Sequence, residues 1–239
     1  MKDHLARELV RRGLVATRSQ AESYIRLGKV KVAGHVVTKT TALVGTEDEL
    51  VLIADERYVS RAGLKLASIA EKLSLEFEDK IVLDVGSSTG GFTDYALQHG
   101  ARRVFAVDIG TNQLHDSLRS NPRIELHEKT DIRDFLPSET PDIVVIDVSF
   151  VSLRQILPHI ARLASKSTEI IAMVKPQFEA NSQQMNRGII KNNALRRKIL
   201  SDFETWAKNY FFVDRKADSE VAGAKGNRER FYKLRILAK

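Results

Sequence analysis

Asp84-Val85-Gly86-Ser87-Ser88-Thr89-Gly90-Gly91-Phe92 directly follows the apolar run Ile81-Val82-Leu83 and leads into a stretch of helical character. Glycines in such a loop let the chain turn tightly from a strand into a helix, and they let the backbone approach a ligand closely. The spacing is Gly-x-x-x-Gly-Gly, unlike the Gly-x-Gly-x-x-Gly of dinucleotide-binding proteins, and an acid stands at its start. Asp84 would repel a pyrophosphate, so the loop indicates a ligand that carries an ammonium group.

Acidic residues also follow the next two predicted strands. Asp108 ends the second strand, 17 residues beyond Gly91, and Asp131-Ile132 follows the third. A carboxylate after the second strand can accept hydrogen bonds from both ribose hydroxyls of an adenosine, and Asp131 is placed to meet the adenine. The pattern predicts S-adenosylmethionine as the cofactor, whereas glycines that merely permit a turn would not need the three acids. The predicted cofactor-binding residues are Ser60, Asp84, Gly86, Ser88, Gly90, Gly91, Phe92, Asp108, Ile109, Asp131 and Ile132.

The order of apolar and helical segments around this loop is typical of an α/β domain. Short apolar runs alternate with helical stretches, at 81–83, 104–107, 143–146 and 170–174. Runs buried on both faces are typical of a parallel sheet covered by helices. Near the end, residues 210–213 and 231–236 flank a turn-rich stretch, as two antiparallel strands at one sheet edge would. The predicted fold class is therefore α/β and Rossmann-like, with a mostly parallel sheet and an antiparallel edge.

The first 45 residues differ from the remainder in charge. They hold nine Lys or Arg and three acids, so they carry nearly all of the net charge of +7. A short helix is predicted over 4–13, Ser19-Gln20-Ala21-Glu22 is typical of a capping box that opens a second helix, and 29–37 reads as a hairpin. Such a compact basic α+β unit indicates a polyanion such as RNA as its partner, although a solvated charged face is the alternative. The predicted RNA-binding residues are Arg7, Arg11, Arg12, Arg18, Lys29, Lys31 and, outside the unit, Arg61.

Composition excludes several classes of protein. The chain has 239 residues and no cysteine, which removes disulfides, thiolate zinc sites and cysteine nucleophiles, and no metal is expected. The longest apolar runs fall far short of the roughly 20 residues that a membrane span needs. No apolar segment follows Met1–His4, so no signal peptide is predicted and a cytoplasmic location is expected.

Several motifs together resemble the TlyA (haemolysin A) family of ribosomal RNA methyltransferases. They are Tyr58–Leu66, the loop Asp84–Phe92, Ile146–Phe150, Val174–Phe178 and Gly226–Glu229. The resemblance runs nearly end to end. It implies an αL-type RNA-binding domain at 1–53, like one found in a small-subunit ribosomal protein, a linker at 54–59 and an FtsJ-like methyltransferase domain with a seven-stranded sheet at 60–239. It also implies methylation of a ribose 2′-hydroxyl, of cytidine, in the rRNA of one or both ribosomal subunits.

The same resemblance places a Lys-Asp-Lys-Glu catalytic tetrad on Lys65, Asp147, Lys175 and Glu229. Asp147 and Lys175 each follow an apolar strand, where open parallel sheets bind ligands. Lys175 is expected to remove the ribose proton or to stabilise the nascent alkoxide, while Lys65 and Asp147 position it and the ribose and Glu229 holds Lys65. Two arginines flank Glu229 and would be able to draw its carboxylate away.

Three alternatives remain at this point. A non-catalytic RNA-binding or ribosome-assembly factor would need the basic unit but not the tetrad. A haemolysin is indicated only by the name of the family. Base methylation usually needs a cysteine nucleophile or an Asn/Asp-Pro-Pro-aromatic motif, and the chain has neither.

Overall fold

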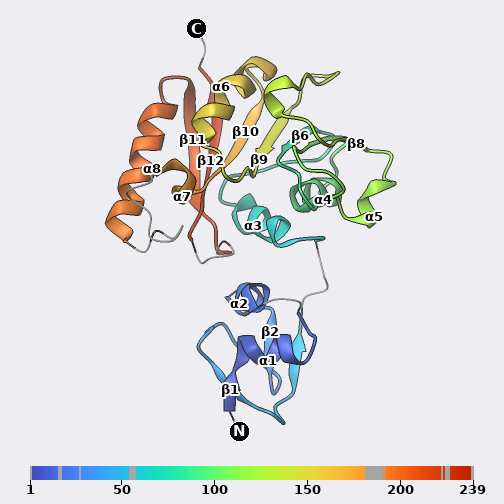
Figure 1. The fold of residues 1–239 in the computed structure, drawn as a ribbon, viewed down its shortest axis with the longest axis vertical. Coiled ribbons are helices and arrows are strands. Elements are labelled where there is room, and N and C mark those ends of the chain that lie inside the picture. The colour runs from blue at the N-terminus through green and yellow to red at the C-terminus, as the bar shows by residue number, and fades with distance from the viewer. Residues whose placement is uncertain are drawn as a thin grey trace. The chain divides into compact units, whose positions relative to one another are not determined.

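A computed structural model describes residues 2–15, 18–26, 28–53, 58–180, 190, 192–221, 223 and 227–237. The chain forms two compact units. The N-terminal unit comprises residues 1–57 with 220–225, and the C-terminal unit comprises residues 58–219 and 226–239 (Figure 1).

The N-terminal unit packs two helices against short strands. Its core is apolar and fully buried at Leu5, Leu9 and Ile25. Strands β3, β2 and β5 form one antiparallel sheet, and β1 pairs with β4. The second helix begins at Arg18, so the prediction that Ser19 caps its start is wrong. The elements are β1 (Lys2–His4), α1 (Leu5–Arg11), α2 (Arg18–Arg26), β2 (Val30–Val32), β3 (His35–Val36), β4 (Leu43–Gly45) and β5 (Leu50–Leu52).

The C-terminal unit contains a seven-stranded sheet in the order β11-β12-β10-β9-β6-β7-β8. The five strands from β10 to β8 run parallel, and β12 and β11 extend them antiparallel at one edge. This arrangement confirms the predicted fold class. The strands are β6 (Ile81–Val85), β7 (Arg103–Val107), β8 (Ile124–His127), β9 (Ile143–Ile146), β10 (Glu169–Val174), β11 (Phe211–Asp218) and β12 (Arg230–Ile236).

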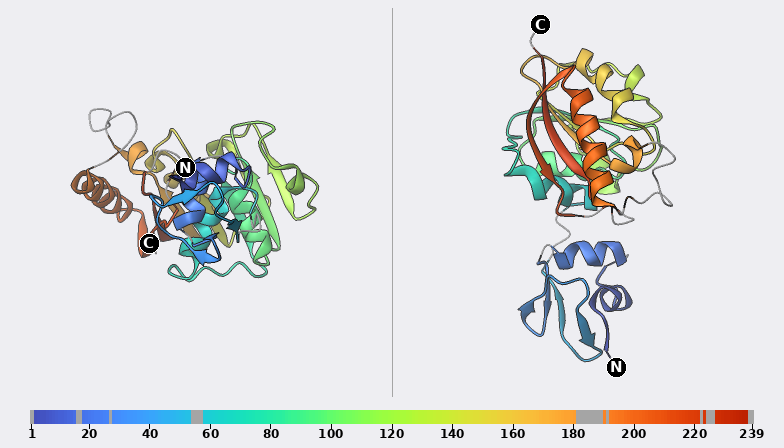
Figure 2. Two further views of the ribbon diagram at one scale, coloured as in Figure 1. Left: turned by 90° about the horizontal axis from the view of Figure 1, so that it is seen from below. Right: turned by 90° about the vertical axis from the view of Figure 1, so that its left-hand side faces the viewer.

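Helices cover both faces of this sheet (Figures 1 and 2). One apolar core joins α3, α4 and α5 to the sheet, and a second core joins α6 and α8 to the opposite face. Both cores consist of residues from Tyr58 onward. The remaining elements are α3 (Arg61–Ala70), α4 (Gly91–Gln98), α5 (Asp116–Arg119), the 3-10 turn η1 (Ile132–Asp134), α6 (Leu153–Leu163), α7 (Pro176–Glu179) and α8 (Asn193–Ala207).

Two glycines allow α3 and α4 to approach each other closely. A Cβ atom on Gly91 would lie 2.8 Å from both the Cβ of Ala62 and the backbone nitrogen of Gly63, and one on Gly63 would lie 2.9 Å from the carbonyl oxygen of Gly91. These distances are shorter than van der Waals contact, and two of the atoms belong to backbone that cannot move alone. The close packing of the two helices therefore requires glycine at both positions.

We expect Gly91→Ala to lower the free energy of unfolding of the C-terminal unit by about 1–3 kcal/mol, because overpacking forces the two helices apart. Denaturant unfolding followed by circular dichroism measures the effect. Gly45→Ala is the matched control, since a Cβ there would meet its nearest neighbour at an ordinary 3.5 Å. An unfolding midpoint for Gly91→Ala equal to that of the unmodified protein would contradict this account.

Candidate active site

The candidate site lies at the carboxyl ends of β6, β9 and β10. Val85 on β6 pairs with Ile146 on β9, and Ile146 pairs with Ala172 on β10, so these strands end close together. Gly86 then turns with φ of +79°, and a Cβ there would lie 2.9 Å from the carbonyl oxygen of Asp147. Glycine is needed at this position because the loop after β6 touches the loop after β9.

The four residues of the predicted tetrad form two buried ion pairs at this edge. Lys175 Nζ lies 2.5 Å from Asp147 Oδ1 and donates a hydrogen bond of 2.8 Å to Ser149 Oγ. Lys65 Nζ lies 2.6 Å from Glu229 Oε2. Both lysines are 8% exposed and Glu229 is 3% exposed.

The two pairs share the edge because of the strand register. Arg230, the first residue of β12, pairs with Val174, the last residue of β10, so Glu229 and Lys175 leave the sheet at the same level. The neighbouring arginines leave Glu229 available to Lys65: Arg230 binds Asp218 at 2.6 Å, and Arg228 is exposed. Lysine–carboxylate pairs that are this buried are rare unless geometry demands them, because desolvation of each charge is costly.

A pocket of about 510 Å³ opens beside the Lys175–Asp147 pair. Its volume lies in the usual range for small-molecule sites. Asp147, Ser149 and Phe150 line it together with six of the predicted cofactor-binding residues. Those six are Gly86, Ser88, Asp108, Ile109, Asp131 and Ile132.

Besides Asp147, two carboxylates line the pocket, and nearby groups hold both of them. Asp108 accepts hydrogen bonds from the backbone nitrogens of Ser88 (2.8 Å) and Gly110 (2.6 Å). Asp131 accepts from the backbone of Arg133 and pairs with its guanidinium at 2.6 Å. The hydrogen bonds from Arg133 lower the pKa of Asp131 to about 2, so this carboxylate stays ionised at any physiological pH.

The other predicted cofactor-binding residues lie behind the pocket wall. Asp84 is fully buried and its Oδ2 accepts from the backbone nitrogen (3.0 Å) and hydroxyl (2.7 Å) of Thr93. Ser60, Gly90 and Gly91 are not among the residues that line the pocket, and Phe92 is 2% exposed within the apolar core. The structure thus brings the loop to the site but gives Gly90, Gly91 and Phe92 packing roles.

Asp84 has an incomplete set of partners. Its Oδ1 makes no hydrogen bond within the described part of the chain. Burial raises the pKa of Asp84 to about 7, and the charges of Asp147 and Asp108 add to that rise, although the bonds from Thr93 oppose it. An unpaired buried carboxylate oxygen in a negative field is suited to a cationic partner.

Sequence reasoning assigned no role to Ser149 or Phe150, although both stand in a quoted motif. Phe150 is 92% exposed and has φ of +67°, a strained conformation for a bulky side chain. Its ring centroid lies 5.3 Å from that of Phe178, and the Phe178 centroid lies 5.9 Å from Lys175 Nζ. An exposed aromatic ring near the Lys175–Asp147 pair offers a stacking surface for a nucleobase.

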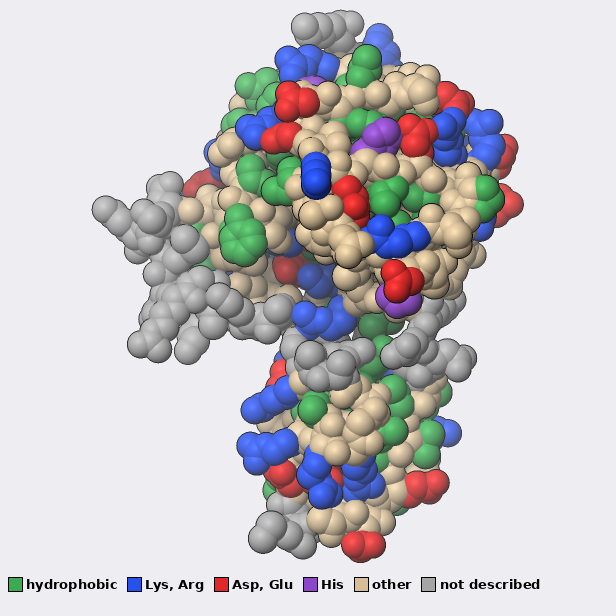
Figure 3. All heavy atoms as spheres, turned by 45° about the vertical axis from the view of Figure 1, so that its right-hand side comes forward, with side chains coloured by type: hydrophobic (Ala, Val, Ile, Leu, Met, Phe, Trp, Pro, Cys, Tyr) green, Lys and Arg blue, Asp and Glu red, His purple; other side chains and the backbone are tan. Residues whose placement is uncertain are grey.

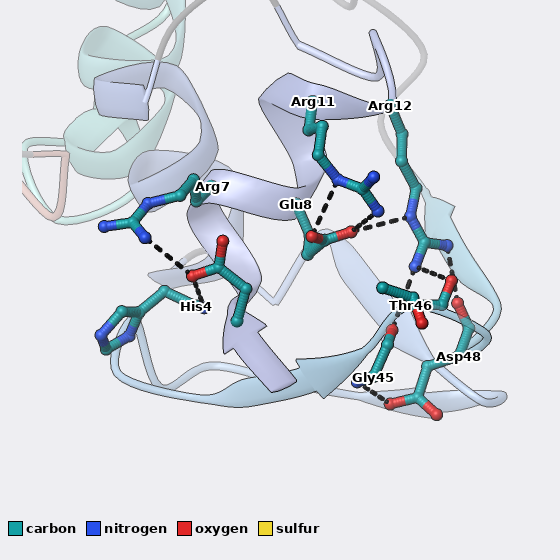
Figure 4. A network of polar contacts seen from close by, with 9 residues as sticks. His4, Arg7, Glu8, Arg11, Arg12, Gly45, Thr46 and Asp48 are labelled. Atoms are coloured by element: carbon teal, nitrogen blue, oxygen red, sulfur yellow. Dashed lines mark hydrogen bonds and ion pairs between the residues drawn. The ribbon is translucent and has the colours of Figure 1, made fainter. Parts of the chain in front are cut away.

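Lys and Arg side chains (blue) lie on the surface of the N-terminal unit in Figure 3. Among the predicted RNA-binding residues, Figure 4 labels Arg7, Arg11 and Arg12, which have different surroundings. Arg12 donates to the carbonyl oxygens of Gly45, Thr46 and Asp48, so its guanidinium holds the β4–β5 turn. Arg11 pairs with the buried Glu8 at 2.7 Å. Arg7, Arg11 and Arg18 remain exposed to solvent, as does Lys29, while Lys31 and, in the C-terminal unit, Arg61 are half-buried.

Within the described residues, no group of three or more His, Asp or Glu side chains is arranged to hold a metal ion. No helix among them has the length and apolarity to cross a membrane.

Comparisons with known proteins agree with this geometry. The FtsJ-like methyltransferase family matches residues 58–235, and the S4 domain family matches residues 5–50. The 16S/23S rRNA (cytidine-2′-O)-methyltransferase TlyA of Mycobacterium tuberculosis is 37% identical over 236 residues, covering 95% of this chain and 88% of that protein. The 23S rRNA (cytidine-2′-O)-methyltransferase TlyA of Campylobacter jejuni is 43% identical over 183 residues, covering 75% and 72%. A solved structure from Streptococcus thermophilus, named for a hemolysin, matches with a TM-score of 0.75 at 36% identity and covers 100% of this chain and 90% of that one.

The fold and the matched families define an FtsJ-like methyltransferase that is preceded by an S4 domain. Within that class the chain belongs to the TlyA family, because it shares more than a third of its residues with the TlyA relatives over most of its length.

Proposed function

We propose that this protein transfers a methyl group from S-adenosylmethionine to the ribose 2′-hydroxyl of a cytidine in ribosomal RNA. The observation that carries the proposal is the buried Lys175–Asp147 pair on the wall of a pocket whose size and carboxylates suit that cofactor. The names of the TlyA relatives and the S4 domain support ribosomal RNA as the substrate.

The pocket residues, together with Asp84 behind the pocket wall, fit the parts of the cofactor. Asp108, directly after β7, would accept hydrogen bonds from the ribose hydroxyls, and Asp131-Ile132 would flank the adenine. Asp84 Oδ1 would pair with the ammonium group. When bound, S-adenosylmethionine supplies an electrophilic methyl group on a sulfonium.

The tetrad residues would prepare the ribose hydroxyl. Lys175, held by Asp147 and Ser149, is placed to take the hydroxyl proton or, as an ammonium, to stabilise the alkoxide that forms. Asp147 orients Lys175, and Glu229 holds Lys65 where it positions the ribose. Phe150 would stack on the base of the target nucleotide. Excluding water around the two ion pairs strengthens each of these interactions.

A direct test is incubation of the purified protein with ribosomal subunits and S-adenosylmethionine, followed by digestion and nucleoside analysis. We expect 2′-O-methylcytidine with an unmodified base. A methylated base would overturn the proposed chemistry, and binding of subunits without methylation would favour an assembly factor.

The cofactor site also predicts a pH dependence of binding. Pairing with an ammonium stabilises ionised Asp84, whose pKa is about 7 in the free protein, so binding releases a proton. Affinity therefore rises as the pH increases through about 7. The α-amino group of the ligand itself loses its charge near pH 8, so the affinity stops rising above that pH. We expect binding of S-adenosylhomocysteine, measured by calorimetry, to be about 20-fold weaker at pH 5.5 than at pH 7.5.

Two variants isolate the contribution of Asp84. Asp84→Asn should bind more weakly at pH 7.5 and show little change in affinity with pH. Asp131→Asn is the control and should keep the pH dependence of the unmodified protein, because the pKa of Asp131 is already about 2. Equal affinities of the unmodified protein at the two pH values would rule out Asp84 as the ammonium partner.

A further inference from the structure

The near-neutral charge of the sequence beyond residue 45 is the sum of two opposite contributions. Residues 46–191 hold 17 Lys or Arg and 22 acids, whereas residues 192–239 hold 12 Lys or Arg and six acids. The last 48 residues are therefore as basic as the first 45. In the fold they form α8, β11 and β12, where α8 (orange) packs on the antiparallel edge of the sheet (Figure 2).

A hollow of about 210 Å³ lies between α8 and these two strands. The charged side chains that line it are four cations and one acid, Glu204. The cations are Arg197, Lys208, Lys216 and Arg230. The remaining lining residues are polar, or apolar and buried, so the hollow offers no exposed apolar anchor.

The acids present are too few to neutralise this surface. Glu204 is shared by Lys216 at 2.6 Å and Lys208 at 3.1 Å. At the other end, Asp218 is shared by Arg230 at 2.6 Å and Arg196 at 2.7 Å. Each carboxylate thus leaves one positive charge uncompensated.

Arg197 adds a third positive charge. It is exposed, and it has no ion pair or hydrogen bond within the described ranges. A concentration of unbalanced cations in one hollow attracts anions.

The hollow begins at the same edge of the sheet as the tetrad. Arg230 pairs with Val174, the residue before Lys175, and Arg196 near the start of α8 donates a 3.0 Å hydrogen bond to the carbonyl oxygen of Arg228. From Arg197 to Lys208 the helix advances about 16 Å. One strand of a duplex carries one phosphate per roughly 3.4 Å of helix axis, so a surface of this length can contact more than one phosphate.

We propose that this hollow is a second RNA-binding surface, which holds the phosphate backbone beside the target nucleotide. The inference rests on the proposed function, since it takes ribosomal RNA as the substrate. Phosphate contacts need positive charge without apolar anchors, which matches the lining. The core of a protein–protein interface is instead depleted in charge and enriched in aromatic residues.

The double variant Arg197→Gln/Lys208→Gln tests this surface, because both side chains are exposed on α8 and neither belongs to the tetrad. Binding to ribosomal RNA transcribed in vitro is measured as a function of salt. We expect the slope of log K against log salt to fall by about 1.4–1.8, since each lost phosphate contact contributes about 0.7–0.9. Affinity at low salt should fall by about tenfold or more, with little change in the single-turnover rate at saturating RNA.

Arg162→Gln/Lys166→Gln is the matched control, because both are exposed cations of the same unit at the end of α6 and beyond it. This pair should leave the salt slope unchanged. A normal slope and affinity for the α8 pair would overturn the inference, as would normal binding to free RNA with weaker binding to intact subunits, which would indicate a protein contact. Failure of the unmodified enzyme to methylate ribosomal RNA would instead refute the proposed function.

Discussion

Replacement of Lys175 by alanine is expected to lower the single-turnover rate of methylation by about 10²–10⁴-fold, the range for loss of an acid–base group. Lys175 is held by Asp147 (2.5 Å) and Ser149 (2.8 Å), which both line the proposed cofactor pocket. A group at this point acts where charge develops on the ribose oxygen, so its loss affects the transition state more than either bound complex. Affinities for cofactor and RNA should change little.

Two further substitutions separate the roles within the tetrad. Lys175→Arg should restore little activity, because a guanidinium stays protonated and its planar fork does not reproduce the ammonium geometry. Glu229→Gln should cost less than Lys175→Ala, since an amide oxygen can still accept a hydrogen bond from Lys65 but does not balance its charge. Near-normal turnover of Lys175→Ala, with circular dichroism showing an intact fold, would end this mechanism and favour a binding factor.

The fold of the C-terminal unit was accessible from sequence because its signals are local. Apolar runs such as Val104–Val107 are buried on both faces of the sheet, and the glycines after β6 occupy positions that no larger side chain fits. The antiparallel edge was likewise visible as two strands around a turn-rich stretch. These patterns need no knowledge of which strands become neighbours.

The details of the site depend on long-range contacts that local patterns do not contain. The pairing of Lys65 with Glu229 joins residues 164 positions apart, and only resemblance to a family predicted it. Phe150 could be found as an aromatic residue in a motif, but neither its exposure nor its strained backbone conformation has a sequence signature. Asp84 stands at the start of the loop, as expected for a cofactor-binding residue, but its side chain is buried behind the pocket wall.

The net charge of a segment also does not show which of its arginines are free to bind RNA. The basic excess of the first 45 residues was plain, but a count treats all arginines alike. Arg12 is directed to three backbone carbonyls of a turn more than 30 residues away, which leaves Arg7, Arg11 and Arg18 as the exposed candidates for RNA. The same count concealed the second basic segment, because an acidic middle region cancels it.

Removal of residues 1–57 is expected to abolish detectable methylation of ribosomal subunits while leaving cofactor affinity unchanged. Both apolar cores of the C-terminal unit consist of residues from Tyr58 onward, and the proposed cofactor pocket is lined by residues from Val85 onward, so the truncated chain should fold and bind S-adenosylhomocysteine. The lost segment carries a net charge of +6 within its first 45 residues. Such charge supplies affinity through release of phosphate counterions, which makes binding steeply dependent on salt.

A variant of the whole chain distinguishes loss of RNA contacts from loss of structure. Arg7→Gln/Arg11→Gln/Arg18→Gln removes three exposed cations and should lower the salt slope for RNA by about 2–2.7. Arg12→Gln is the contrasting variant: it should destabilise the N-terminal unit, because three carbonyl oxygens and Glu8 lose their donor. A truncated protein that methylates subunits at the full-length rate would show that the S4 domain does not supply the affinity, and the exposed arginines would then be a solvated face.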